Sequence, residues 1–143
     1  MILLDVNILL HLHNESSPSH RPINLWLNQA IEIGEWLGIP PQVLWSFLRI
    51  ATNPRIFSNP MTGQEAMDAV TALLTAQRVR LIHPGPRHFE LLSRFIAAEN
   101  AIGNLVPDAV LAALAQEFGA TVASTDDDFR RFDVPWINPS KAI

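Results

Sequence analysis

The aspartates with the clearest chemical potential follow segments that read as buried strands. Asp5 comes directly after the apolar run at residues 2–4, and Asp126 and Asp128 follow the apolar segment 121–123. Asp108 falls in the first turn of a helix expected just before that segment. Ligands of open α/β sheets bind beyond the carboxyl ends of the strands. We therefore expect three separate segments of the chain to bring carboxylates to one rim.

A group of neighbouring carboxylates repels itself unless a cation lies among them. The chain has no cysteine and no clear histidine arrangement, and hard carboxylate oxygens suit Mg²⁺ or Mn²⁺. Such an ion keeps several waters, which can serve as nucleophile or proton source. Phosphodiester hydrolysis commonly uses this arrangement. The acids therefore indicate a Mg²⁺ or Mn²⁺ site with hydrolytic chemistry.

Each acid also has a purely structural interpretation. Asp5 can begin a turn with Asn7, and Asp108 can serve only to complement the dipole of its helix. Asp126 can be an Asx-turn residue or the cap of a short helix that runs through Asp128. Their common location, at strand ends or at the adjacent helix start, favours the chemical interpretation.

Hydrophobic spacing and turn residues predict short strands that alternate with longer helices. We expect strands at 2–4, 36–39, 79–82, 121–123 and 136–137, and helices at about 22–33, 41–52, 63–76, around 89–96, and 104–118. Thr62 and Glu65 form a predicted capping box at the start of the third helix. The pattern predicts a single α/β domain over residues 1–143, with a mainly parallel sheet wrapped by helices in an α/β/α sandwich.

Composition narrows the class of protein further. Hydrophobic residues make up 48% of the 143 residues and charged residues 17%, so the chain is a globular domain and not a disordered tail. No apolar run approaches the roughly 18 residues of a membrane helix, and the first residues lack the features of a signal peptide. With no cysteine present, we expect a cytoplasmic protein. A net charge of −4 argues against a passive coat for nucleic acid.

Four motifs together resemble one known family. Residues 2–9 (ILLDVNIL) resemble the opening of PIN domains, and residues 47–57 (FLRIATNPRIF) look like a stretch common in VapC toxins. Residues 103–109 (GNLVPDA) and 124–129 (STDDDF) resemble the GNLVxDA and TTDxDF motifs of the same toxins. Their order and spacing agree along essentially the whole chain. The sequence is thus similar to PIN-domain ribonucleases, specifically the VapC-like toxins of type II (VapBC) toxin–antitoxin pairs.

This resemblance implies a PIN-like α/β/α fold and a metal-dependent endoribonuclease that cleaves RNA, often transfer or ribosomal RNA. It also implies inhibition by a cognate VapB antitoxin and a homodimer whose acidic pockets lie along a shared face. Carried over to this chain, the metal-site acids are Asp5, Asp108 and Asp126, with Asp128 as a further catalytic acid and with Asn7 and Thr125 as supporting polar residues.

One position departs from the family pattern. Where the family normally has a glutamate before the Phe of the FLR stretch, this chain has Ser46. A hydroxyl can hold a metal-bound water but brings no negative charge, so weaker metal binding or the loss of one of two metal sites is expected. The alternative is a degenerate, non-catalytic PIN module that binds antitoxin or RNA. Near the motifs, Trp45, Arg49 and Arg55 are the predicted RNA contacts.

Other assignments have less support. A haloacid-dehalogenase-like phosphatase would need a second aspartate where this chain has Asn7, and a receiver domain would need adjacent acids after the first strand. His11 and His13 can face one side of a strand as a metal pair, but a helix turn or loop is the favoured placement. The apolar helices at 22–33 and 63–76 either form a groove for an antitoxin helix or belong to the core.

Overall fold

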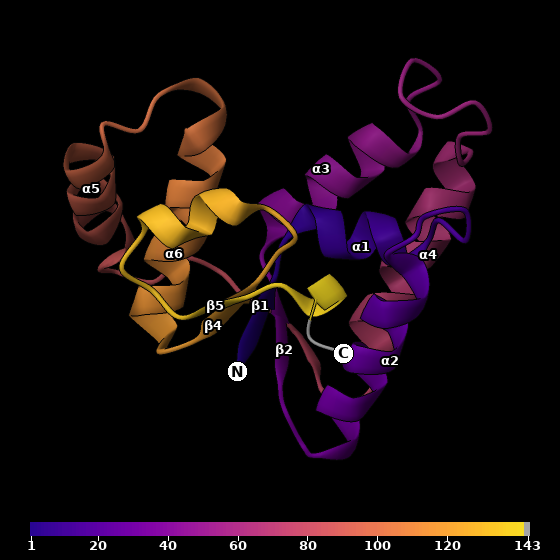
Figure 1. The fold of residues 1–143 in the computed structure, drawn as a ribbon, viewed down its shortest axis with the longest axis horizontal. Coiled ribbons are helices and arrows are strands. Elements are labelled where there is room, and N and C mark those ends of the chain that lie inside the picture. Colours follow the sequence, from indigo (N-terminus) through magenta and orange to yellow (C-terminus); the bar gives the residue numbers. More distant parts are fainter. Residues whose placement is uncertain (142–143) are drawn as a thin grey trace.

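The computed structural model describes residues 1–141, and a parallel five-stranded sheet lies at its centre (Figure 1). The strand order is β3-β2-β1-β4-β5, and every neighbouring pair is parallel. The strands are β1 (Ile2–Leu4), β2 (Leu37–Ile39), β3 (Val79–Leu81), β4 (Thr121–Ala123) and β5 (Trp136–Ile137). All five correspond to predicted strands, and β1 is the middle strand, with β2 and β4 on either side.

The helices also follow the prediction, with one addition. They are α1 (Val6–Leu12), α2 (His20–Glu32), α3 (Pro41–Ala51), α4 (Gly63–Thr75), α5 (His88–Glu99) and α6 (Val106–Phe118), with 3₁₀ turns at Gly103–Leu105, Asp127–Arg131 and Pro139–Lys141. The predicted capping box is confirmed, since the Glu65 N–H donates to Thr62 Oγ1 at 3.1 Å and the Thr62 N–H to Glu65 Oε1 at 3.3 Å. Helix α1 was not predicted, because seven residues are too few for a clear helical period.

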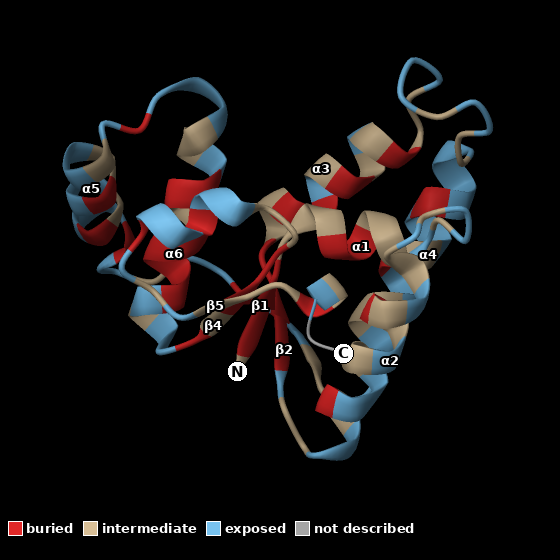
Figure 2. Ribbon diagram, in the orientation of Figure 1, coloured by how far each residue is buried: buried red, intermediate tan, exposed pale blue. Residues whose placement is uncertain are grey.

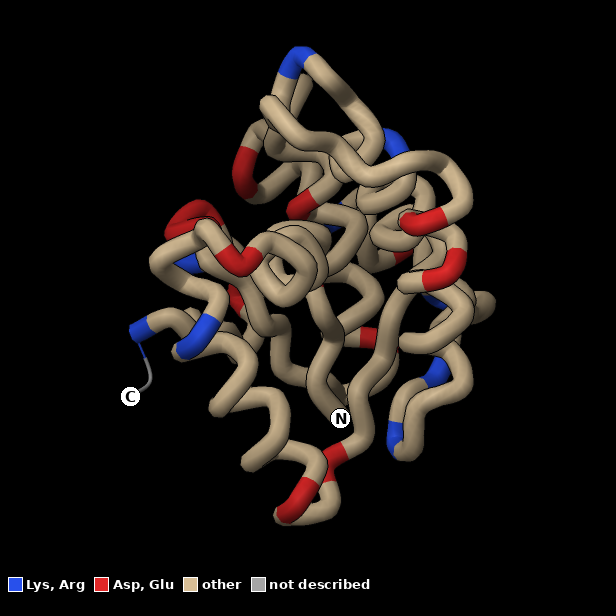
Figure 3. The backbone as a smooth tube through the Cα atoms, turned by 90° about the vertical axis from the view of Figure 1, so that its right-hand side faces the viewer, with Lys and Arg blue, Asp and Glu red and all other residues tan. Residues whose placement is uncertain are grey.

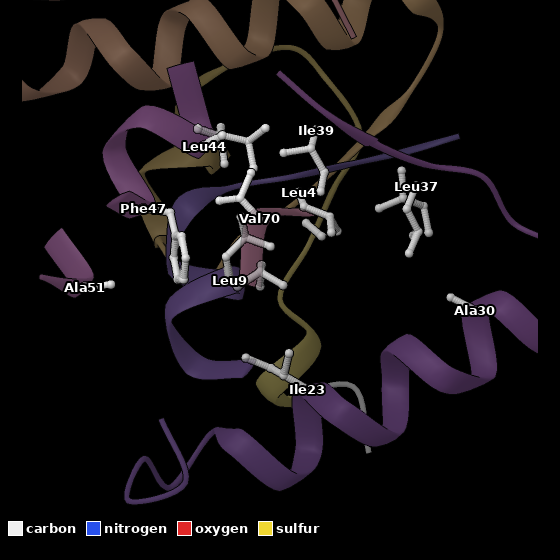
Figure 4. Packing of buried hydrophobic residues seen from close by; sticks show 14 of the residues in the cluster. Leu4, Leu9, Ile23, Ala30, Leu37, Ile39, Leu44, Phe47, Ala51 and Val70 are labelled. Carbon is white, nitrogen blue, oxygen red and sulfur yellow. The ribbon is translucent and has the colours of Figure 1, made fainter. Parts of the chain in front are cut away.

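Successive residues of a strand face opposite sides of the sheet, and this alternation divides the core in two. Ile2 and Leu4 of β1 pack on α1 to α4, together with Ile23 and Phe47 (Figure 4). Leu3 lies in the other cluster, where residues of α5 and α6 cover the sheet. The central strands are accordingly buried on both faces (Figure 2). The three-layer α/β/α architecture is confirmed.

The amphipathic helices expected at 22–33 and 63–76 belong to the core. Ile23 and Ala30 of α2 and Ala66 and Val70 of α4 are buried in the same cluster as β1. The buried residues of these two helices therefore pack in the core, which is one of the two roles that the sequence left open for them. Within residues 1–141, every helix falls short of the length and apolar character needed to cross a bilayer.

Gly38 in β2 is a position where the sheet leaves no room for a side chain. A Cβ placed there would lie 2.7 Å from both Leu3 Cδ2 and Ile82 Cγ1, closer than carbon atoms normally approach. We predict that Gly38→Ala lowers the free energy of unfolding by about 1–3 kcal/mol through overpacking, measured by urea denaturation.

Gly63→Ala is the matched control, because Gly63 begins α4 and has no atoms within 4 Å of the added Cβ. It should be neutral or raise stability by up to about 1 kcal/mol. Equal midpoints for the two variants would contradict the packing argument.

Candidate active site

The ends of β1 and β4 bring the first acidic segment next to the last one. The two strands are parallel neighbours, with Leu4 paired to Ala123, so Asp5 and Ser124 are the next residues along each strand. The Asp5 N–H donates to the Ala123 carbonyl at 3.0 Å, which continues the pairing one step past β1. Asp5 is also the N-cap of α1, and its Oδ1 accepts from the Val6 N–H at 2.7 Å.

The Ser124 side chain joins the two strand ends. This fully buried hydroxyl donates to Asp5 Oδ2 at 2.7 Å and accepts from Asn7 Nδ2 at 2.9 Å and from the Asp126 N–H at 3.0 Å. One donated and two accepted bonds use the full capacity of a hydroxyl. Asn7 completes the network, because its Nδ2 also donates to Asp5 Oδ2 and its Oδ1 accepts from the Thr125 N–H.

Three carboxylates gather beside this network. One oxygen from each of Asp108, Asp126 and Asp128 can be chosen so that all three lie within 4.8 Å of one another. Asp108 comes from the first turn of α6, and the other two from the turn after β4. The Asp126 side chain accepts from the Asp128 N–H at 2.9 Å, which fixes the turn. The structure thus brings together carboxylates from two of the three expected segments, and Asp5 is not part of this group.

The pKa values of the aspartates reflect how closely these carboxylates lie and how deeply they are buried. Burial, reinforced by the charges of Asp126, Asp5 and Asp128, raises the pKa of Asp108 to about 7. Burial also raises the pKa of Asp5, while hydrogen bonds from Ser124, Val6 and Asn7 oppose that rise. Negative charge at this place is thus unfavourable without a positive partner.

The donor set fits a hard divalent cation. All the groups that converge are oxygen donors, and carboxylates at these separations can share one ion of the Mg²⁺ or Mn²⁺ type. Burial, together with repulsion from the neighbouring carboxylates, raises the pKa of Asp108, and a bound cation would offset both effects. Asp5 lies outside this group of three, and both of its oxygens accept hydrogen bonds from the chain.

A pocket of about 390 Å³ opens beside Asp5 and includes Ser46. Ser46 therefore lines the pocket next to Asp5, at the position where the resemblance places the family glutamate. Trp45 and Arg49 do not, since they line a separate open groove between α3 and α4. Arg55 lies exposed in the turn after α3. The structure brings these three predicted RNA contacts to the flank of α3 and not to the pocket.

The supporting residues of the site include one that the sequence did not indicate, and the role of Thr125 differs in detail. Thr125 contributes its backbone N–H to the network rather than its hydroxyl. Ser124, to which the sequence reasoning gave no role, is the centre of the network. A serine directly after a buried strand and two residues before an aspartate is a recognisable signal, because its hydroxyl can accept from that residue's N–H in a local turn.

The raised pKa of Asp108 carries a consequence for stability without metal. Its folded pKa of about 7 exceeds the unfolded value of 3.8, so its contribution to stability is present below 3.8 and is lost as the pH rises through about 7. Asp108→Asn removes the charge while keeping the shape. In EDTA at pH 8 we predict that this variant melts roughly 5–10 °C above the wild type, from on the order of 2 kcal/mol relieved.

This gain should shrink as the pH falls to about 5, where Asp108 of the wild type is protonated in the fold. Asp133→Asn, on an exposed aspartate, is the control and should leave the melting temperature unchanged. A wild type as stable as Asp108→Asn at pH 8 would contradict the cost of burial and repulsion described above.

Comparison with known proteins agrees with this architecture. Residues 2–135 match the family model of the PIN domain. The chain is 44% identical to Ribonuclease VapC31 of Mycobacterium tuberculosis over 133 residues, which cover 92% of this chain and 93% of that protein. It is 39% identical to Ribonuclease VapC25 of the same species over 132 residues, which cover 92% and 93%.

Among solved structures, VapBC-1 from nontypeable Haemophilus influenzae superposes with a TM-score of 0.74 at 18% identity, over 99% of this chain and 100% of that one. That likeness concerns the fold, whereas the family match and the two ribonucleases concern the sequence itself. Together with the shared motifs around the carboxylates, they establish that this chain belongs to the PIN-domain family and, within it, is similar to the VapC ribonucleases.

Proposed function

We propose that the chain is a metal-dependent endoribonuclease, a VapC-like toxin that hydrolyses phosphodiester bonds of transfer or ribosomal RNA. The observation that carries this proposal is the convergence of Asp108, Asp126 and Asp128 within 4.8 Å, next to Asp5 and its pocket. The names of the sequence relatives support the reaction class, since both are ribonucleases.

Asp108, Asp126 and Asp128, with Asp5 beside them, are the residues that would hold Mg²⁺ or Mn²⁺. When bound, such an ion supplies charge stabilisation for the phosphate and lowers the pKa of a bound water. The chain's own part is preorganisation, because Ser124 and Asn7 fix the Asp5 carboxylate before any ligand arrives. In the reaction, water adds across the P–O bond, its hydroxide going to phosphorus and its proton to the leaving ribose oxygen.

The charge distribution of the protein supports the need for a cation. The net charge is −4, and the lysines and arginines are scattered in the view of Figure 3 instead of forming one stripe. Affinity for phosphates depends on local positive charge. At a site lined by aspartates, that charge must come from a bound ion, because the side chains there repel a phosphate.

Purified protein incubated with total RNA tests the proposal. With Mg²⁺ or Mn²⁺ we expect discrete fragments, and these should vanish in EDTA. Asp126→Asn should lower the cleavage rate by at least about 100-fold, because it removes one of the three clustered carboxylates. Asp133→Asn, exposed and outside the cluster, is the control and should cleave like the wild type. Unchanged cleavage in EDTA or by Asp126→Asn would refute the proposal.

The serine at position 46 supports a second candidate function, which is a non-catalytic PIN module that binds antitoxin or RNA. Ser46 lines the pocket beside Asp5, where the family glutamate would add a further carboxylate. We propose that its absence weakens metal binding here. By calorimetry, Ser46→Glu should bind Mn²⁺ roughly tenfold more tightly, because the number of charged ligands sets affinity.

Ser93→Glu adds the same charge to an exposed position on α5 and should leave Mn²⁺ affinity unchanged. Equal affinities for wild type and Ser46→Glu would show that Ser46 is irrelevant to the metal. Full RNA cleavage by the wild type would remove the non-catalytic alternative.

We also propose a VapB-like antitoxin and a second copy of the chain as partners. The fold likeness to the VapBC-1 structure supports the first. Trp45 is 67% exposed in the groove between α3 and α4, next to Arg49. Together with Arg55, these residues remain our predicted RNA contacts. An RNA strand bound at the pocket would reach them by crossing α3.

A further inference from the structure

The pocket beside Asp5 has a composition unlike that of the carboxylate cluster. Its walls are mainly apolar, and they come from the start of α1, the start of α3, from α6 and from the turn before α5. Those apolar residues are Val6, Val43, Pro84, Val106, Pro107, Val110 and Leu111. The remaining lining residues are Asp5, Gln42 and Ser46. Its volume of about 390 Å³ lies within the usual range of small-ligand pockets.

Gln42 and Ser46 are one helical turn apart on α3 and line the same side of this pocket. Both side chains are partly buried, and within residues 1–141 neither has a buried polar atom left unpaired, so both are free to bond a ligand. The Gln42 amide offers two N–H donors and one acceptor oxygen. A ligand that fills this pocket must therefore form hydrogen bonds with the Gln42 amide as well as contact the apolar residues.

The wall opposite α3 is held in place. The Glu117 carboxylate of α6 accepts from the Gly85 N–H at 2.9 Å and from the Arg87 N–H at 3.0 Å. A side chain at Gly85 would place its Cβ 2.5 Å from Glu117 Oε2, so this close contact depends on glycine. Pro84, which precedes the clamped segment, is thereby fixed as part of the pocket lining.

Resting on the proposed function, we propose that this pocket binds the base of a nucleotide adjacent to the scissile phosphodiester, with Gln42 as the residue that reads the base edge. A phosphate is disfavoured in the pocket, because its one ionisable lining residue is the carboxylate of Asp5. A purely aliphatic group would leave the Gln42 amide unpaired. A base has apolar faces for the prolines and valines and a polar edge for the amide, as in pockets that hold extruded bases.

Nuclear magnetic resonance of the metal-free protein tests the base site without any cleavage. Each of the four ribonucleosides is titrated in EDTA, with ribose alone as the sugar control. At least one nucleoside should shift the side-chain amide signals of Gln42 and the methyl signals of Val110, while ribose should not. Gln42→Met, which keeps the length of the side chain, should weaken that binding about three- to tenfold. Gln29→Met, on the exposed side of α2, is the matched control and should bind like the wild type.

Sequencing of fragments from a random single-stranded RNA pool tests the reading of the base. The wild type should show a base preference at one position next to the cut, and Gln42→Met should flatten that preference while the other positions keep theirs. An unchanged preference would overturn the role of Gln42. Pocket signals that respond to no nucleoside, or equally to ribose, would overturn the base site and leave a protein partner as its occupant.

The two proposals fail separately. A wild type that cleaves no RNA contradicts the endoribonuclease function, while the nucleoside titration still decides the pocket. A wild type that cleaves RNA but binds no nucleoside retains the function and loses this inference.

Discussion

The hydrogen bonds of the Ser124 hydroxyl are the interactions that hold the site together. It lies fully buried at the end of β4 and has one bond to Asp5, one to Asn7 and one to the backbone of Asp126. Through these bonds the end of β1, the start of α1 and the turn after β4 become one rigid unit. Because its bonding capacity is filled, the hydroxyl fixes the Asp5 segment relative to the Asp126 segment.

This rigidity has an electrostatic cost. Holding carboxylates together in a partly buried place raises the pKa of Asp108 to about 7 and also raises that of Asp5. The fold tolerates this repulsion because the strand pairing and two apolar clusters on either side of the sheet supply the stability. The result is a group of carboxylates whose mutual repulsion lowers the stability of the fold, as expected where chemistry and stability compete. A bound cation would stabilise the fold as well as serve the reaction.

Much of this arrangement was predictable from the sequence, for identifiable reasons. Buried strands such as residues 2–4 and 121–123 form short apolar runs that end at polar residues, and parallel topology then places those ends together. Helix α1 was not predicted, because its seven residues are too few for a clear helical period and because its capping residue Asp5 was considered only as an acid or a turn residue. The central role of Ser124 was missed as well, because it depends on a contact with Asp5, 119 residues away in sequence. The separation of Trp45 from Ser46 follows from helical geometry, which turns adjacent residues to different faces.

The two surfaces of α3 show how one substitution can alter chemistry and recognition together. One surface presents Gln42 and Ser46 to the pocket, and the other presents Trp45 and Arg49 to an open groove. A glutamate at position 46 would place a second charge in a pocket whose other walls are mainly apolar, and an apolar environment penalises such a charge. Serine leaves that wall neutral, so under the two proposals it would weaken the hold on a cation and make the pocket a better environment for an uncharged aromatic ring. Both effects would arise from the same missing carboxylate.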